Sequence, residues 1–230
     1  LCIAGVLLEG LHIPDDTLHW FLNPDAGEIA GWVPEGNAWV RTYLSFWGDR
    51  KPRFSGFSGL ARLLRDMEWT GTGREFFSRT RSAGPLATFD AADRWVEYPY
   101  KNGVALLGDS AASNDPTWGQ GLSIALRSAR TLRDALMARL DWDQAGNDYA
   151  REFRRWYTNI RRMTGWLREL YMETGAAADV RRGQVFSLKK RDPSRYPDLL
   201  FSGPDFPLDS ESRARFFGED LWGRVSVQAA

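Results

Sequence analysis

The residues best suited to chemistry lie close together, between positions 103 and 122. Residues 104–107 form an apolar run that ends at Gly108 and Asp109, which predicts a buried strand with a carboxylate at its carboxyl end. Loops at this end of the strands gather ligands in α/β domains, and Gly108 has no side chain to block a ligand. Asp109 is therefore placed to accept hydrogen bonds from ligand hydroxyl groups.

A second group of residues stands where a helix is predicted to begin. Pro116 stiffens the turn, and Gly119, Gln120 and Gly121 follow, with two glycines that leave backbone N–H groups uncovered. The positive end of the helix dipole lies at this position. We expect electron-rich ligand atoms to bind there.

Together these residues resemble the second flavin-binding motif of FAD-dependent monooxygenases of the aromatic-ring hydroxylase (para-hydroxybenzoate hydroxylase-like) family. That motif commonly reads Gly-Asp-Ala-Ala-His, then Pro and Gly-Gln-Gly, and the chain has Gly108, Asp109, Pro116 and the tripeptide 119–121. The resemblance implies that Asp109 binds the ribityl hydroxyls of FAD. It also implies that the amides around Gly121 and Leu122 face the N1 and C2-carbonyl edge of the flavin, where a helix dipole stabilises the negative charge of the reduced form.

Two departures from the family pattern lie between the two halves of the motif. Ser113 stands where the family commonly has His, and Ser does not titrate near neutral pH, so no role of that His is transferred. The run 114–118 contains an Asp and a Trp that are untypical of the phenol hydroxylases, so the substrate class is not transferred either. The resemblance places Pro85, Phe89 and Trp118 beside a substrate cavity, with ordinary packing as the alternative for these residues.

The resemblance implies a monooxygenase. In its cycle NADH or NADPH reduces FAD, oxygen adds at the flavin C4a atom, and the hydroperoxyflavin transfers an oxygen atom to a hydrophobic or aromatic small molecule. Related folds serve flavin-dependent halogenases and reductases, and a non-catalytic fragment that acts as an interaction module is a further alternative. No side chain of the chain is assigned as a catalytic acid or base.

The family's Gly-x-Gly-x-x-Gly dinucleotide fingerprint is not found in the sequence. The run 71–76 comes nearest, but Phe76 stands where the third glycine is required, and no β-branched strand precedes the run. The chain begins with Leu1 and enters at once on an apolar segment. We therefore expect the C-terminal portion of a longer gene product.

Composition is typical of a folded protein and disfavours several classes of function. The 230 residues are 43% hydrophobic and 13% aromatic, which is enough to bury a substantial core. Lys plus Arg and Asp plus Glu both number 30, so no net field attracts nucleic acid. No apolar run approaches the ~20 residues that span a bilayer, and no signal peptide is recognised. We expect a cytoplasmic protein; its oligomeric state is not predictable from the sequence.

Cysteine and histidine are scarce. Cys2 is the single cysteine and only two histidines are present, so we expect neither a disulfide nor a metal centre. Cys2 is interpreted as a small core residue.

The elements that position these residues are predicted to form a mixed α/β protein, α+β when taken as a fragment. We expect an antiparallel substrate-domain sheet with one helix over residues 1–98. Part of a Rossmann-like FAD-binding domain is expected over residues 99–140, and a helical C-terminal extension over residues 141–230. Strands are predicted over residues 1–11, 18–21, 32–33 and 39–47, and a helix over residues 57–69.

Two further helices are predicted after the motif. Over residues 119–140, apolar residues at three- and four-residue spacings predict one buried face: Leu122, Ala125, Leu126, Ala129, Leu132, Leu136 and Leu140. Over residues 145–174, an aromatic stripe predicts core packing, and the arginines are interpreted as a solvated face because acidic residues interleave with them. After Gly175 we expect an irregular tail.

Overall fold

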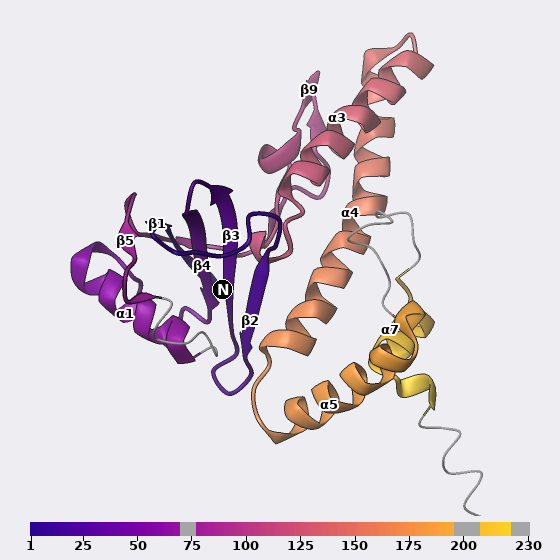
Figure 1. Cartoon of the computed structure of the whole chain (residues 1–230). Coiled ribbons are helices and arrows are strands. Elements are labelled where there is room, and N and C mark those ends of the chain that lie inside the picture. Colours follow the sequence, from indigo (N-terminus) through magenta and orange to yellow (C-terminus); the bar gives the residue numbers. More distant parts are fainter. Residues whose placement is uncertain (70–76, 196–207, 222–230) are drawn as a thin grey trace, which may run out of the picture. The chain divides into compact units, whose positions relative to one another are not determined.

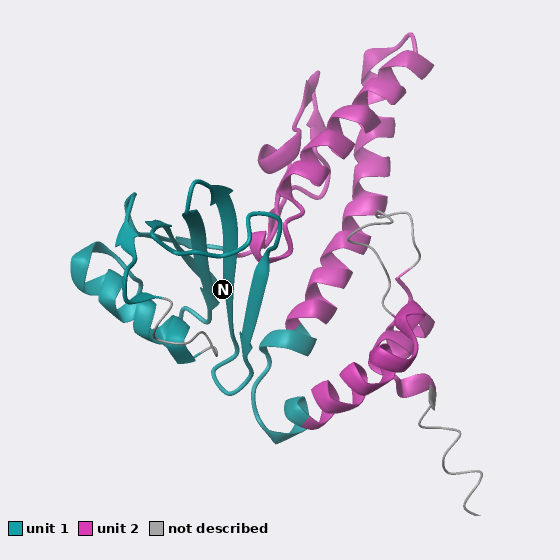
Figure 2. Ribbon diagram, in the orientation of Figure 1, with its two compact units in different colours: residues 1–91, 169–179 teal, residues 92–168, 180–230 magenta. Residues whose placement is uncertain are grey.

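The computed structural model describes residues 1–69, 77–195 and 208–221. Contacts divide the chain into two compact units, residues 1–91 with 169–179, and residues 92–168 with 180–230 (Figure 2). The mixed α/β class is confirmed, because antiparallel strands and helices both occur (Figure 1). These units are defined by contacts and do not test the predicted domains, so the predicted domain boundaries after residues 98 and 140 stay predictions. The run 71–76 lies outside the described residues.

The first unit is built on a six-stranded antiparallel sheet. Its strand order is β2-β3-β4-β1-β5, and β6 also pairs with β1. The antiparallel sheet predicted for this part of the chain is confirmed. The strands are β1 Cys2–Glu9, β2 His19–Asn23, β3 Glu28–Gly36, β4 Trp39–Phe46, β5 Arg81–Ser82 and β6 Ala87–Asp90.

Alternation along β1 explains how helix α1 (Gly56–Trp69) packs on the sheet. Cys2, Val6 and Leu8 point to the same face because the side-chain period of a strand is two, and all three are buried. Leu63 and Met67 of α1 are fully buried in the same cluster, as the helical spacing predicts. Cys2 is confirmed as a core residue. The rest of this core comprises Ala4, Leu11, Ala30, Trp32, Val40, Leu44, Phe46, Phe54 and Phe77.

The turn between β2 and β3 requires glycine at position 27. Gly27 has a φ of +65°, and a Cβ atom there would lie 2.4 Å from the carbonyl oxygen of Met172. The indole nitrogen of Trp47 donates a hydrogen bond to the same carbonyl, at 3.2 Å. Met172 is the last residue of helix α4 (Trp142–Met172). The end of α4 is thus held within the first unit.

The remainder of α4 organises the second unit. Its aromatic stripe is buried as predicted: Tyr149, Phe153, Trp156 and Tyr157 have no exposed surface. The rings of Phe153 and Tyr157 stack with their centres 5.4 Å apart. The solvated-face interpretation is confirmed for the arginines of the opposite side, among which Arg151, Arg154 and Arg155 are exposed.

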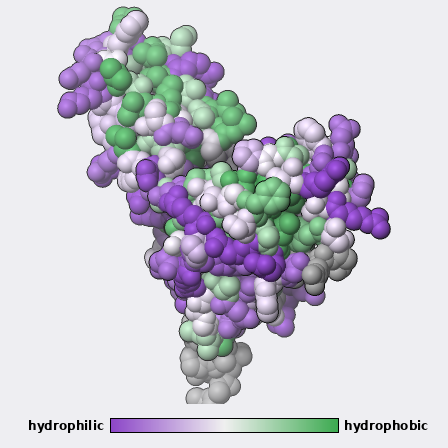
Figure 3. Space-filling model, turned by 90° about the vertical axis from the view of Figure 1, so that its left-hand side faces the viewer, coloured by the Kyte–Doolittle hydropathy of each residue, from purple (hydrophilic) through white to green (hydrophobic). Residues whose placement is uncertain are grey.

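The buried face predicted for helix α3 (Gly121–Ala138) is wrong for the described part of the chain. Leu122 is 74% exposed, Leu126 64% and Leu140 fully exposed. The residues of α3 that are buried are Ile124 and Ser128. Figure 3 shows that hydrophobic patches occur on the surface of the protein. We call Leu122, Leu126 and Leu136 the leucine stripe. Its spacing is that of a buried helix face, yet no described element covers it.

The buried strand predicted before the Gly-Asp pair is also wrong. Strand β9 comprises only Val104–Ala105 and, within the described ranges, pairs with β8 (Tyr100–Lys101) alone. Val104 is 61% exposed. A buried strand has neighbours on both sides, and a single hairpin supplies one. A second small ladder joins β7 (Arg94–Trp95) to β10 (Ala112–Ser113).

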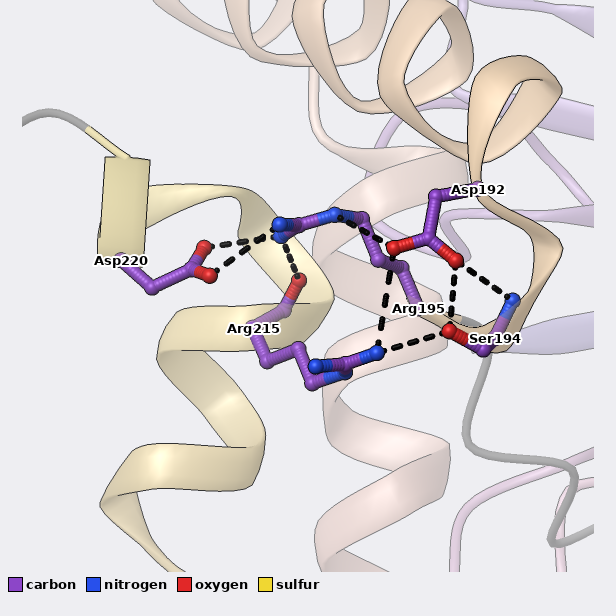
Figure 4. Close-up of polar contacts among 5 residues, drawn as sticks. All are labelled: Asp192, Ser194, Arg195, Arg215 and Asp220. Carbon is purple, nitrogen blue, oxygen red and sulfur yellow. Dashed lines mark hydrogen bonds and ion pairs between the residues drawn. The ribbon is translucent and has the colours of Figure 1, made fainter.

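The C-terminal region contains more helix than the irregular tail predicted after Gly175. Helices α5 (Ala176–Arg191) and α7 (Ser210–Phe217) show that this expectation is wrong. Pro193 lies beyond the last residue of α5 and therefore does not interrupt this helix. Figure 4 shows how Arg195 joins the two helices: it pairs with Asp220 at 2.8 Å and donates to the carbonyl of Arg215.

None of the helices in the described ranges combines the length and the apolar composition that a membrane crossing requires.

Lys189 of α5 makes the stability of the protein depend on pH. Its amine lies 3.5 Å from the centre of the Phe216 ring, and burial lowers its pKa to about 7. Since an unfolded lysine has a pKa of about 10.4, the unfolded chain binds more protons between these values. Folding stability therefore rises with pH across this window.

We expect the substitution Lys189→Met to raise the free energy of unfolding at pH 7 and to flatten its rise towards pH 10. Urea denaturation at several pH values measures both effects. Lys190→Met removes the same charge from the exposed neighbour and serves as the control. A Lys189→Met variant with the pH dependence of the parent would contradict the prediction.

Candidate functional site

Gly108 allows the chain to turn sharply against α3. It begins a 3₁₀ turn (Gly108–Ser110) with a φ of +54°, in the left-handed region that favours glycine. A Cβ atom on Gly108 would lie 3.3 Å from the Cβ atom of Ala125. The hydroxyl of Ser110 closes the turn by donating to the carbonyl of Leu107, at 2.7 Å. Gly108 is therefore required for the packing of this turn on the helix.

Asp109 stands on this turn with a free carboxylate. The residue is exposed, and no described group forms a hydrogen bond or ion pair with its side chain. A carboxylate in water can accept several hydrogen bonds from the hydroxyl groups of a polyol. The position agrees with the role that the motif implies.

The start of α3 is left open. Gln120 is the N-cap residue, but its side chain forms no capping bond and donates instead to the carbonyl of Trp118, at 3.2 Å. The first N–H groups of a helix have no partner within the helix. A Cβ atom on Gly119 or Gly121 would meet nothing within 4 Å, so no described group crowds the Cα atoms of these two glycines. The predicted residues thus form an uncapped helix end that can receive an electron-rich group.

The polypeptide before α3 is held by side chains of α4. The Tyr149 hydroxyl donates to the carbonyl of Leu106, at 2.5 Å, and the Tyr157 hydroxyl donates to that of Ser113, at 3.5 Å. Burial raises the pKa of Tyr149 to about 12 and raises that of Tyr157 as well. Both hydroxyls therefore keep their protons at neutral pH and remain donors.

A partly buried ion pair network, which the sequence analysis missed, fixes the middle of this loop. Asp115 has no exposed surface, and its side chain accepts a hydrogen bond from the backbone of Thr117, at 3.0 Å. Arg168 of α4 lies 3.2 Å from Asp115 and 3.2 Å from Asp93. The second oxygen of Asp93 accepts the backbone N–H of Asp115, at 2.9 Å. We call Asp93, Asp115 and Arg168 the Arg168 clamp.

The interpretation of Arg168 as part of a solvated face is therefore wrong. A buried carboxylate is costly unless it is paired and hydrogen-bonded, and Arg168 supplies the charge that Asp115 needs. One signal in the sequence pointed to Asp115: an Asp directly before Pro116 is the pattern of a capping residue followed by proline at the first helical position. No comparable signal identified Arg168.

The three predicted substrate residues lie in different units. Pro85 and Phe89 belong to the first unit, where Phe89 is 43% exposed on β6, and Trp118 belongs to the second. A cavity lined by all three stays a prediction. Phe89 points to the face of the sheet that bears Trp20 and Tyr43, as the strand register requires.

Two glycines on that face provide room for aromatic rings. A Cβ atom on Gly31 would lie 3.3 Å from the Trp20 ring, and one on Gly5 would lie 3.0 Å from the Tyr43 ring. These pairs face each other directly across neighbouring strands. The first unit thus carries a partly exposed aromatic face, opposite the face that α1 covers.

Other candidate sites are weaker. A cavity of about 560 Å³ between α3 and α4 is lined by charged side chains such as Arg130, Asp134 and Glu152, and by none of the predicted cofactor residues. Among the residues that the structure describes, no three His, Cys, Asp or Glu side chains are grouped to hold a metal ion.

Neither a protein-family model nor a curated protein matches the sequence. Solved structures do resemble the chain. The flavin-dependent brominase Bmp2 is 13% identical with a TM-score of 0.68, over 97% of this chain and 56% of that one. The myxobacterial chondrochloren halogenase CndH is 15% identical with a TM-score of 0.61, over 96% and 55%. The p-nitrophenol 4-monooxygenase PnpA from Pseudomonas putida DLL-E4 is 17% identical with a TM-score of 0.65, over 84% and 49%.

These likenesses define the fold. The fold of the chain is similar to that of a part of flavin-dependent halogenases and monooxygenases, and the chain spans about half the length of those proteins. The flavin-dependent oxidoreductase fold that the motif implies is thereby supported. Membership of the para-hydroxybenzoate hydroxylase-like family in particular stays a prediction.

The geometry at Gly108 makes a testable prediction about stability. We expect Gly108→Ala to lower the free energy of unfolding by about 1–3 kcal/mol, because alanine is strained at this φ and the new methyl group presses on Ala125. Gly165→Ala, in the interior of α4 with open space around it, is the matched control and should stabilise by about 0.5–1 kcal/mol. Denaturant unfolding measures both; equal effects of the two variants would refute the prediction.

Proposed function

We propose that the chain supplies the second FAD-binding segment of a flavin-dependent oxidoreductase, a monooxygenase that acts on a hydrophobic or aromatic small molecule. One observation carries the proposal: a free, exposed Asp109 precedes the uncapped start of α3, in a chain with the fold of flavin-dependent enzymes. These hydrogen-bonding groups suit FAD: the carboxylate can accept hydrogen bonds from hydroxyl groups, and the backbone amides can donate to an electron-rich ring edge.

Each part of the motif has a distinct task in this proposal. Asp109 accepts hydrogen bonds from the ribityl hydroxyls. The amides of Gly121 and Leu122 donate to the N1 and C2-carbonyl edge, and the positive end of α3 stabilises negative charge there. Gly108, Pro116, Gly119 and Gln120 shape the turn that brings these groups together. FAD, when bound, supplies the redox chemistry, with NADH or NADPH as the proposed reductant.

The leucine stripe of α3 supports the view that further residues complete the flavin site. Leu122 and Leu126 expose most of their surface, although their spacing is that of a buried face. About half of each matched structure lies outside the match. We infer that equivalent residues cover the stripe, because burying a leucine contributes about 1.5–3 kcal/mol.

The substrate contacts are proposed on the aromatic face of the first unit. Phe89, Trp20 and Tyr43 present rings on one side of the sheet, and two of them lie over glycines. Aromatic rings that lie on the face of a sheet suit the binding of a planar apolar molecule. Pro85 and Trp118 are further proposed contacts. A cytoplasmic location is part of the same proposal.

A halogenase is the second candidate function. The matches to the halogenases Bmp2 and CndH extend over 97% and 96% of the chain, whereas the match to the monooxygenase PnpA extends over 84%. The resemblance to the aromatic-ring hydroxylases supports the monooxygenase, but related halogenases share the motif, and the more complete fold match supports the halogenase.

The first prediction from the proposal concerns FAD binding. Titration of the purified chain with FAD, followed by flavin absorbance and fluorescence, should show saturable binding. Because Asp109 makes charged hydrogen bonds worth about 1.5–3 kcal/mol, Asp109→Ala should weaken the affinity roughly 10- to 100-fold. Asp49→Ala, at an exposed aspartate of the first unit, is the control and should bind as the parent does. A folded chain that binds no FAD would overturn the proposal.

A second prediction separates the two candidate functions. The chain is joined to the residues that complete the flavin site and loaded with FAD. It is then supplied with NADH or NADPH, oxygen, a phenol and bromide, and the product is identified by mass spectrometry. A monooxygenase adds one oxygen atom to the phenol, with or without bromide. A halogenase replaces a hydrogen atom by bromine and depends on bromide. The monooxygenase proposal predicts the first result, and a brominated product would favour the alternative.

A further inference from the structure

We propose that the Arg168 clamp positions the loop before α3 and sets the electrostatic potential at the flavin edge. Asp93, Asp115 and Arg168 carry one net negative charge between them, which disfavours the reduced, anionic flavin. The inference rests on the flavin site proposed above. In this role the three residues are positioning residues, because they act on the flavin through the loop and through their charge.

The clamp controls the backbone directly before the helix start. Asp115 accepts a hydrogen bond from the Thr117 amide through its side chain, and its own amide donates to Asp93. The 3₁₀ turn Pro116–Trp118 follows, and the Gly119 amide closes it on the carbonyl of Pro116, at 3.0 Å. The position of Asp115 is thereby passed on to the first amides of α3. Since Arg168 belongs to α4, the long helix determines where the loop stands.

The charges of the clamp are poorly screened. Asp115 has no exposed surface, and the side chains of Asp93 and Arg168 are 16% and 26% exposed. Buried charges are screened by salt much less than surface charges and act over longer distances. The nearby Tyr157 hydroxyl is neutral, because burial raises its pKa, and the guanidinium of Arg161 stacks on the Trp95 ring, 4.6 Å from its centre. Within the clamp itself, two carboxylates face a single guanidinium, so the charges of the clamp oppose a negative flavin, while the cation of Arg161 adds a constant contribution in every variant.

This arrangement predicts shifts of opposite sign, which a merely structural role does not. Asp93→Asn leaves the Asp115–Arg168 pair neutral, so reduced flavin is favoured and the midpoint potential of bound FAD rises. Arg168→Gln leaves two carboxylates without a cation, so the potential falls. In each variant the ratio of affinities for reduced and oxidised flavin changes by roughly three- to tenfold, the effect of one charge in a medium of effective dielectric near 20.

The experiment is a spectroscopic redox titration of FAD bound to the parent chain and to Asp93→Asn, Arg168→Gln and Arg168→Lys. Arg168→Lys keeps the charge and should restore the parent potential. Arg155→Gln, which removes an exposed charge from the same helix, is the matched control and should leave the potential unchanged. Without flavin, hydrogen exchange at the Thr117 amide should be faster in Arg168→Gln, because the loop has lost its anchor.

The outcomes separate this inference from the proposed function. If the parent binds FAD but both charge variants shift the potential in the same direction, or if neither variant shifts it, the inference is wrong and the flavin site stands. If the parent binds no FAD, the proposed function fails and the inference with it. If Arg168→Gln does not fold, the potentials of Asp93→Asn and Arg168→Lys are compared instead. A potential that is raised in Asp93→Asn but not in Arg168→Lys supports the inference, and equal potentials in the two variants overturn it.

Discussion

The contacts along the buried side of α4 are the constraint on which the candidate site depends. Tyr149, Tyr157 and Arg168 reach from one helix to three points of the chain between residues 106 and 115. They are spread over about five turns of α4. Because the tyrosine rings pack in the core while their hydroxyls donate to backbone carbonyls, the same side chains stabilise the helix and locate the loop. The proposed flavin-binding segment takes its shape from a helix that lies outside the segment itself.

Apolar sequence patterns predicted those strands and helices whose packing partners also lie within the described part of the chain. A continuous apolar run located β1, alternation located β4, and helical spacing located α1 and the aromatic side of α4. The leucine stripe shows where this reasoning ends. Spacing shows that Leu122 and Leu126 are suited to burial, but it does not say which element buries them, and none of the described elements does so. The strand expected before Gly108 differs from the structure for the same reason, since β9 has a single neighbour.

The residues of the candidate site were predictable, because a short motif contains Asp109 and the start of α3. The residues that hold this segment in place were not predictable, because each of them is identified by a partner that is distant in sequence. Arg168 lies 75 positions from Asp93, and in the sequence it is one of several arginines on the same helix. Only the fold shows that this arginine meets buried carboxylates while Arg151 and Arg154 remain exposed.

The tie between Gly27, Trp47 and Met172 has a consequence for how the protein folds as it is synthesised. The bond from Trp47 to Met172 spans 125 residues, and the first unit includes residues 169–179. The sheet of this unit therefore leaves the ribosome long before its last segment does. Native contacts of such high sequence separation form late, because the chain between them must first be ordered or looped out. The first unit stays incomplete until nearly the whole of α4 has been translated, so folding of the two units is coupled through one helix.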